Sequence, residues 1–115
     1  MQATVEYEPI VRKLLEKSEE GRLNWEKKRW GGFSCTIEEQ YTFNAVKTAD
    51  GYQLTMMDSQ GDEMFSIAGE EAVVYDDPKK EELFTTLRDL YELARKKALN
   101  VDEKIATAAG LLDKV

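Results

Sequence analysis

Carboxylates are the reactive side chains that this sequence supplies most freely, with 23 Asp and Glu among 115 residues. Five of them fall in two short segments between runs of alternating apolar and polar residues: Glu38, Glu39, Asp58, Asp62 and Glu63. Carboxylates with separated pKa values can act as acid and base, and several together can hold a hard cation. The spacing Asp58-x-Gln60-x-Asp62 resembles the start of a calcium loop. However, Glu63 stands where that loop needs glycine and Gly69 where it needs glutamate. We therefore interpret the five residues as an acidic patch on turns, and predict no metal site.

The side chains most used in catalysis are missing or badly placed. Histidine is absent from the sequence, which excludes catalytic triads built on it and removes the commonest metal ligand. Cys35, the single cysteine, falls between Phe33 and Ile37 on the predicted inward side of a strand, where a thiol behaves as a small apolar group. No glycine-rich phosphate loop is present. We predict no catalytic residue, no cofactor and no enzymatic activity.

The segment Trp25-Glu26-Lys27-Lys28-Arg29-Trp30 is the one concentration of basic and aromatic residues. Tryptophan stacking and phosphate pairing by arginine or lysine can bind single-stranded nucleic acid or a nucleotide. In the other interpretation, one or both tryptophans pack on the core while the cations stay solvated. The net charge of -7 favours the second interpretation and argues against direct binding to a nucleic-acid backbone.

The acidic turns depend on a predicted antiparallel meander between Phe33 and Ile67. Four short runs alternate between apolar and polar residues there, and short turns separate them. Such turns give antiparallel neighbours in the order 1-2-3-4, so the two acidic segments should lie at the same end of the sheet. Asp50-Gly51 predicts a hairpin turn in which Gly51 takes a positive φ.

The residues before the meander predict a helix over about 8–20, with Pro9 in its first position and Gly21 as its left-handed stop. Residues 22–32 are predicted as a loop that can include a short strand.

Two helices are predicted after the meander. Asp77 fits the N-cap of a long helix that begins at Pro78 and runs to about Leu99. Asn100 and Glu103 have capping-box spacing and predict the start of a last helix. Four apolar residues of that helix are predicted to pack inward: Ile105, Ala108, Leu111 and Leu112.

The predicted fold class is α+β: an N-terminal helix, a four-stranded antiparallel meander, a long helix packed on the sheet and a short C-terminal helix. A chain of 115 residues suffices for one core and is short for two, so we expect residues 1–115 to form a single domain.

The outward side of the predicted sheet carries no charged residue, in a chain where 34% of residues are charged. Such a face can receive a protein partner, pair with a second copy in a dimer, or lie beneath the first helix. It can also reflect the strand preference of threonine alone. We predict partner-binding residues at its centre: Thr42, Asn44, Val46, Gln53, Thr55, Met57 and Met64.

Three segments resemble those of small uncharacterised bacterial and phage-type proteins: LLEKSEEGRLNWE, GYQLTMMDSQGDEMFSI and LRDLYELARKKALNVDEKI. Those proteins pair a GYxLxLxDxxG hairpin with an LYELARxxAL helix followed by VDE, and the resemblance covers residues 8–113. This sequence departs from the hairpin motif at Met56-Met57. The resemblance implies an α+β fold and brings no catalytic residue.

We expect a non-catalytic protein-interaction domain of a bacterium, phage or mobile element, which binds an unidentified protein or itself through the uncharged sheet face. A second hypothesis is an acidic inhibitor that blocks the basic nucleic-acid-binding site of a defence nuclease or similar enzyme. A third is a secretion-type chaperone, although the helix usual between strand pairs of that family is not evident. We expect a cytoplasmic protein without membrane contact, because the chain shows no apolar run of membrane-spanning length and has one cysteine.

Overall fold

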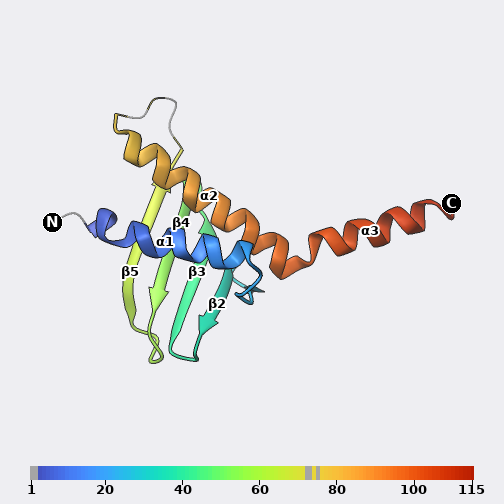
Figure 1. The fold of residues 1–115 in the computed structure, drawn as a ribbon, viewed down its shortest axis with the longest axis horizontal. Coiled ribbons are helices and arrows are strands. Elements are labelled where there is room, and N and C mark those ends of the chain that lie inside the picture. Colours follow the sequence, from blue (N-terminus) through green and yellow to red (C-terminus); the bar gives the residue numbers. More distant parts are fainter. Residues whose placement is uncertain (1–2, 72–73, 75) are drawn as a thin grey trace.

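The computed structural model describes residues 3–71, 74 and 76–115. Within these ranges the chain forms helices and one antiparallel sheet, so the α+β class predicted from the sequence is confirmed (Figure 1). The elements in chain order are α1 (Ala3–Glu19), β1 (Glu26–Lys27), β2 (Phe33–Ile37), β3 (Tyr41–Lys47), β4 (Gly51–Met57), β5 (Glu63–Glu70), α2 (Pro78–Leu99) and α3 (Val101–Leu112).

The sheet has the strand order β1-β2-β3-β4-β5, with every neighbouring pair antiparallel. The predicted meander is confirmed, but the predicted number of four strands is wrong within the described part of the chain. The added strand β1 pairs Lys27 with Phe33 and Glu26 with Ser34. It has two residues, both exposed, and two residues are too few to show the alternation by which a strand is recognised in a sequence.

The inner face of the sheet builds the core because its apolar residues stand opposite one another across the strands. The register pairs Ala45 with both Phe33 and Leu54, and pairs Leu54 in turn with Ile67. All four side chains are buried. Each of these residues alternates with an outward-facing neighbour along its strand, as the predicted meander requires.

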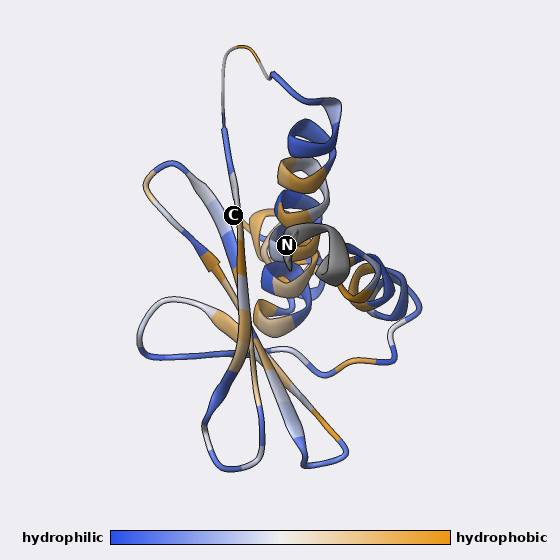
Figure 2. Ribbon diagram, turned by 90° about the vertical axis from the view of Figure 1, so that its left-hand side faces the viewer, coloured by the Kyte–Doolittle hydropathy of each residue, from blue (hydrophilic) through white to orange (hydrophobic). Residues whose placement is uncertain are grey.

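Both long helices lie on the same side of the sheet. The four buried residues of α2 face the strands: Leu83, Leu87, Leu90 and Ala94. Helix α1 packs against α2, and its buried Val11 and Leu14 join the same core (Figures 1 and 2). The first helix therefore does not cover the second face of the sheet, and no described element lies across that face.

Helix α2 approaches the sheet closely at β5 and along a row of aromatic rings. A Cβ atom added to Gly69 would lie 2.8 Å from the Cα atom of Phe84, so this contact depends on a residue without a side chain. Tyr91 packs its ring against Phe33 and Tyr52, with centroid distances of 5.4 and 5.3 Å. These contacts hold α2 across the whole width of the sheet.

The ends of α1 and α2 agree with the sequence except at the start of α1. The predicted start near residue 8 is wrong, because the helix begins at Ala3 and Pro9 lies inside it. The missing N–H of Pro9 removes one backbone hydrogen bond, and the helix continues across it. Gly21 has the predicted left-handed conformation, with φ of 75°. Asp77 is the predicted N-cap of α2, and its Oδ1 accepts a hydrogen bond from the Lys79 amide at 2.9 Å.

The role predicted for Gly51 in the hairpin turn is wrong. Its φ is not positive; instead it opens β4, opposite Glu70 and beside Gly69. A Cβ atom on Gly51 would lie 2.0 Å from the Gly69 carbonyl oxygen. Glycine is required here by the close approach of two strands.

Helix α3 departs most from expectation. Asn100 joins it to α2 with a left-handed backbone (φ 51°, ψ 48°), and the Asn100 side chain makes no capping hydrogen bond, so the predicted capping box is wrong. The inward packing predicted for Ile105, Ala108, Leu111 and Leu112 is also wrong, since all four are exposed. The helix leads away from the body past the β1–β2 edge of the sheet (Figure 1), and the molecule measures 59 × 39 × 26 Å.

Candidate functional site

The sheet face turned away from the helices, called the outer face here, gathers all the predicted partner-binding residues. The register pairs Thr42 with Met57, and it pairs Val46 with Gln53. Thr55 stands between Asn44 on β3 and Ser66 on β5. Opposite residues of paired strands share a face, so the structure brings these side chains into one surface.

Several hydroxyl and amide groups on the outer face hydrogen-bond one another. The Thr36 and Thr42 hydroxyls lie 3.0 Å apart, as expected for a cross-strand hydrogen bond. Gln53 donates its Nε2 hydrogen to Ser66 Oγ at 2.6 Å, and the Thr55 hydroxyl lies 3.2 Å from the same oxygen. A surface whose polar groups are already paired loses little hydrogen bonding when a partner excludes water from it.

The apolar members of the outer face lie toward the β4–β5 pair. Met57 is half-buried and Met64 is 47% exposed. A register shift after Met56 leaves Met64 as an extra residue, because Met56 pairs with Phe65 while Met57 pairs with Glu63. Such a bulge turns a side chain outward, and methionine adapts its shape to a partner more easily than branched residues do.

Among the residues that the structure describes, charged side chains reach the outer face only at its rim. Glu26 stands opposite Ser34 on the edge strand, and Glu63 stands opposite Met57 where β5 begins. Glu26 lies in the segment predicted as a loop that can include a short strand, and the sequence pattern assigns it to no face of the sheet. An uncharged centre within a charged rim is the usual anatomy of a protein interface.

The predicted acidic patch is made of turn residues at one end of the sheet. The β2–β3 and β4–β5 turns share that end, as the meander requires (Figure 1). Asp58 Oδ1 accepts hydrogen bonds from the Gln60 and Asp62 amides at 2.9 and 3.0 Å, so this carboxylate serves its own turn. In the described ranges no three Asp, Glu or Cys side chains are grouped so that they could hold a metal ion.

Glu38 and Glu39 hold an unusual backbone conformation in the β2–β3 turn. Their φ angles are 54° and 59°, although glutamate disfavours the left-handed region by about 1–2 kcal/mol per residue. The turn closes through a hydrogen bond from the Gln40 amide to the Ile37 carbonyl at 2.9 Å. Both side chains are exposed, so this strained turn presents two carboxylates to solvent beside the outer face.

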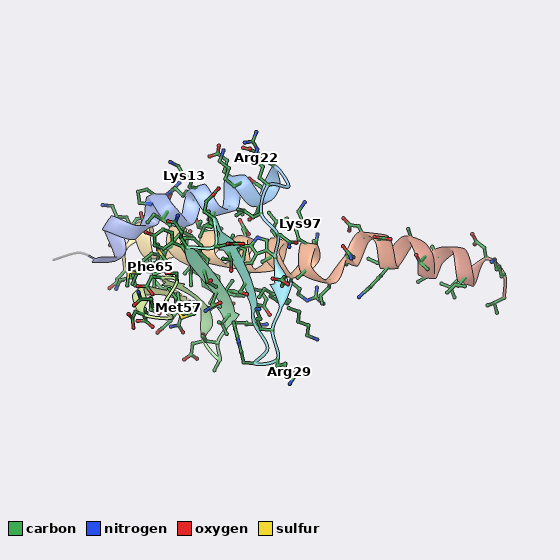
Figure 3. All side chains as sticks on the ribbon, turned by 90° about the horizontal axis from the view of Figure 1, so that it is seen from below. Lys13, Arg22, Arg29, Met57, Phe65 and Lys97 are labelled. Atoms are coloured by element: carbon green, nitrogen blue, oxygen red, sulfur yellow. The ribbon has the colours of Figure 1, made fainter. Side chains whose placement is uncertain are left out.

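The two tryptophans of the basic segment have different surroundings. Trp25 is buried and donates its Nε1 hydrogen to Ser18 Oγ at 2.9 Å, while Ser18 donates to the Leu14 carbonyl at 2.7 Å. Trp30 is 54% exposed. Arg29 lies at the tip of the β1–β2 connection, away from the helices (Figure 3). The interpretation that a tryptophan holds this segment on the core is confirmed for Trp25, and the segment offers no stacked pair of tryptophans.

Cys35 lies on the inner face of β2 with 1% of its surface exposed. Burial raises the pKa of its thiol from 9.0 to about 12, so the sulfur is protonated at neutral pH. The predicted packing role is confirmed, because a protonated and inaccessible thiol is a poor nucleophile.

The exposed apolar residues of α3 form a second surface that sequence reasoning missed. Ile105 is 61% exposed, Leu111 59% and Leu112 71%. The sequence pattern shows that α3 has an apolar side, but it cannot show that the core is already complete without that side.

No protein-family model, no curated protein and no solved structure shows significant similarity to this chain. Among the described helices, none is both long and apolar enough to cross a membrane.

Proposed function

We propose that this chain is a non-catalytic protein-binding domain whose contact surface is the outer face of the sheet. The observation that carries the proposal is the pairing of the polar side chains of that face with one another. The hydroxyls of Thr36, Thr42 and Thr55 all have side-chain partners on the same face. A protein that covers this face therefore meets fewer free donors and acceptors than the same residues would offer without these bonds, and each donor left buried and unpaired would cost about 1–3 kcal/mol.

The position of the helices supports the proposal. Both α1 and α2 lie on the inner side, so the absence of charge from the centre of the outer face is not explained by a helix of the described chain packed over it (Figure 2). The rim glutamates and the acidic turns then act on the partner at longer range. They favour a partner with basic groups around its own contact surface and raise the rate of association more than the final affinity.

A charge placed at the centre of the outer face tests the proposal. Thr55→Arg should abolish complex formation, because the guanidinium must lose its water between Asn44 and Ser66, neither of which carries a charge. Met57→Arg should weaken binding less, because the Glu63 carboxylate stands opposite it. The measurement is retention of bound protein by the tagged chain in an extract of its host, with light scattering for self-association. Ala49→Arg, which adds the same charge at an exposed turn, is the matched control and should bind as the wild type does.

Two outcomes would contradict the proposal. Binding that survives Thr55→Arg and Met57→Arg, with circular dichroism showing an intact fold, would exclude the outer face as the contact surface. The four changes Glu38→Gln, Glu39→Gln, Asp58→Asn and Asp62→Asn should together leave most of the binding in place. Complete loss of binding in that variant would instead favour the acidic inhibitor of a basic site.

A further inference from the structure

Two surfaces of the described chain are uncovered: the outer face of the sheet and one side of α3. Neither carries a charge at its centre. The outer face has an uncharged centre, and α3 carries an apolar stripe with no buried residue. The stripe runs along one side of the helix at alternating spacings of four and three residues: Val101, Ile105, Ala108 and Leu112. That spacing is typical of a helix side that packs on another surface along its whole length.

Helix α3 is placed so that it cannot cover the outer face of its own chain. One residue, Asn100, separates it from α2, and α2 lies on the opposite side of the sheet. From that junction α3 leads outward along the long axis of the molecule, past the β1–β2 edge (Figures 1 and 3). No described residue covers its apolar stripe, so a cover must come from outside the described residues.

The distribution of charge indicates which surface can pack against the apolar stripe of α3. The solvent side of the helical layer carries many charged groups, among them Lys13, Glu16 and Arg88, and Figure 3 shows Lys13 directed away from the sheet. An apolar helix laid there would strip water from these charged groups, which is costly. The centre of the outer face carries no charge, and its hydroxyls are already paired.

The area that α3 can bury indicates how many contacts of this kind a stable complex needs. A helix of 12 residues is about 18 Å long and about 10 Å wide, so one helix-on-sheet contact covers roughly 200 Å² in projection. In accessible surface it buries roughly 400 Å² on each partner, which falls short of the about 1,000 Å² in total that a specific interface needs. The same limit applies to a pair of α3 helices on their own. Two such helix-on-sheet contacts in one complex reach roughly 1,600 Å², the usual size of a stable interface.

We propose that two copies of this chain form a twofold dimer in which α3 of each copy lies across the outer face of the other. The inference rests on the contact role proposed above for the outer face, and it names the partner as a second copy. A twofold axis beside the β1–β2 edge makes the two contacts identical and closes the assembly at two chains. The apolar stripe of α3 and the centre of the outer face are then both removed from water.

Light scattering on the full chain gives the first test. The mass should be twice the 13.2 kDa of one chain, and Thr55→Arg and Ile105→Glu should each return it to one chain. Glu103→Lys, a charge change on the opposite side of α3, is the control and should leave the dimer intact. A wild-type chain that stays monomeric up to millimolar concentration would overturn the inference.

Cross-linking identifies the surfaces that meet. A Thr55→Cys copy mixed with an Ala108→Cys copy should be joined by a short bis-maleimide, and neither variant should cross-link to itself. The native Cys35 is buried and does not interfere. Glu103→Cys in place of Ala108→Cys is the matched control, and its yield should be several-fold lower. Cross-linking of Ala108→Cys to itself would show that the α3 helices pair with each other, which overturns the arrangement.

The two proposals fail in different ways. A dimer that persists in Thr55→Arg overturns the exchange of α3, and the contact role of the outer face then depends on whether Thr55→Arg abolishes the capture of a different protein. A monomeric wild type whose binding to a different protein is lost in Thr55→Arg overturns the dimer and supports the contact role of the face. A monomer that retains its partner in Thr55→Arg contradicts both.

Discussion

The thiol of Cys35 lies opposite Phe43 on the inner face of the sheet. Its pKa is raised because the thiolate would lose its water in the core and find no positive charge there. Trp25 shows the other solution to burial, since its N–H has a partner in Ser18. The buried Cys35 thiol therefore stays uncharged, whereas the buried Trp25 N–H is hydrogen-bonded.

The raised pKa of Cys35 predicts a loss of stability in alkaline solution. Below pH 9 the thiol is protonated in both the folded and the unfolded chain, so it gives no pH dependence. Between pH 9 and about 12 the unfolded chain releases this proton and the folded chain keeps it, so the free energy of unfolding falls as pH rises, by up to about 1.4 kcal/mol per pH unit.

Urea unfolding of the wild type and of Cys35→Ala at pH 8, 9, 10 and 11 measures this effect. The variant removes the thiol but keeps every other alkaline titration. The stability advantage of the wild type should be constant up to pH 9 and shrink by about 1 kcal/mol for each further pH unit. An advantage that stays constant to pH 11 would mean that the thiol ionises as easily in the folded chain as in the unfolded one.

Sequence reasoning identified single residues well where their role depends on near neighbours along the chain. Asp77 and Gly21 have the roles predicted for the ends of helices, because those roles are set within one helical turn. Gly51 has a different role, because its requirement for glycine comes from Gly69, which lies on another strand. A requirement that depends on the pairing of distant strands cannot be read from the local sequence.

At the scale of elements, the contact of α2 with β5 depends on one missing side chain. The nearest neighbours of a Cβ atom on Gly69 would be backbone atoms of Phe84, its Cα at 2.8 Å and its N at 3.1 Å. Backbone atoms of a packed helix cannot move aside as a flexible side chain can, so the helix as a whole would have to shift.

Gly69→Ala should therefore lower the free energy of unfolding by about 1–3 kcal/mol, the usual cost of overpacking a core. Gly110→Ala is the matched control, since a Cβ there meets nothing within 4 Å. In that variant the urea midpoint should stay unchanged, and the helical signal in circular dichroism should rise because alanine favours a helix over glycine by about 1 kcal/mol. Equal stability of Gly69→Ala and the wild type would show that α2 is held less closely than its contacts indicate.

Elements were predicted from the sequence wherever the pattern was long enough. The meander and α2 each repeat their period several times, so their alternation or helical stripe is unambiguous. Strand β1 has two residues and shows no period. Helix α3 shows a clear apolar side, yet its position depends on the left-handed backbone of Asn100, and capping-box spacing gave no sign of that conformation.

At the scale of the whole molecule, the placement of α1 decides which surfaces are free. The sequence shows that α1 has one apolar side but not whether that side meets α2 or the second face of the sheet. The structure packs α1 on α2 and leaves the outer face open. Alternation along the strands therefore predicts which candidate residues share a face of the sheet. It does not predict that this face is exposed, because exposure depends on how separate elements assemble.

A shortened chain that ends at Asn100 lacks α3. It distinguishes the stability of the sheet and its two covering helices from the stability that association adds. Helix α3 contributes no buried residue, so removing it should change the free energy of unfolding by less than about 1 kcal/mol in dilute solution. The full chain should gain stability as its concentration rises, because association stabilises the folded state, whereas the shortened chain should not. Urea midpoints at two concentrations a hundredfold apart measure both effects. A shortened chain that loses several kcal/mol would show that α3 packs on its own body, which contradicts its exposure in the structure.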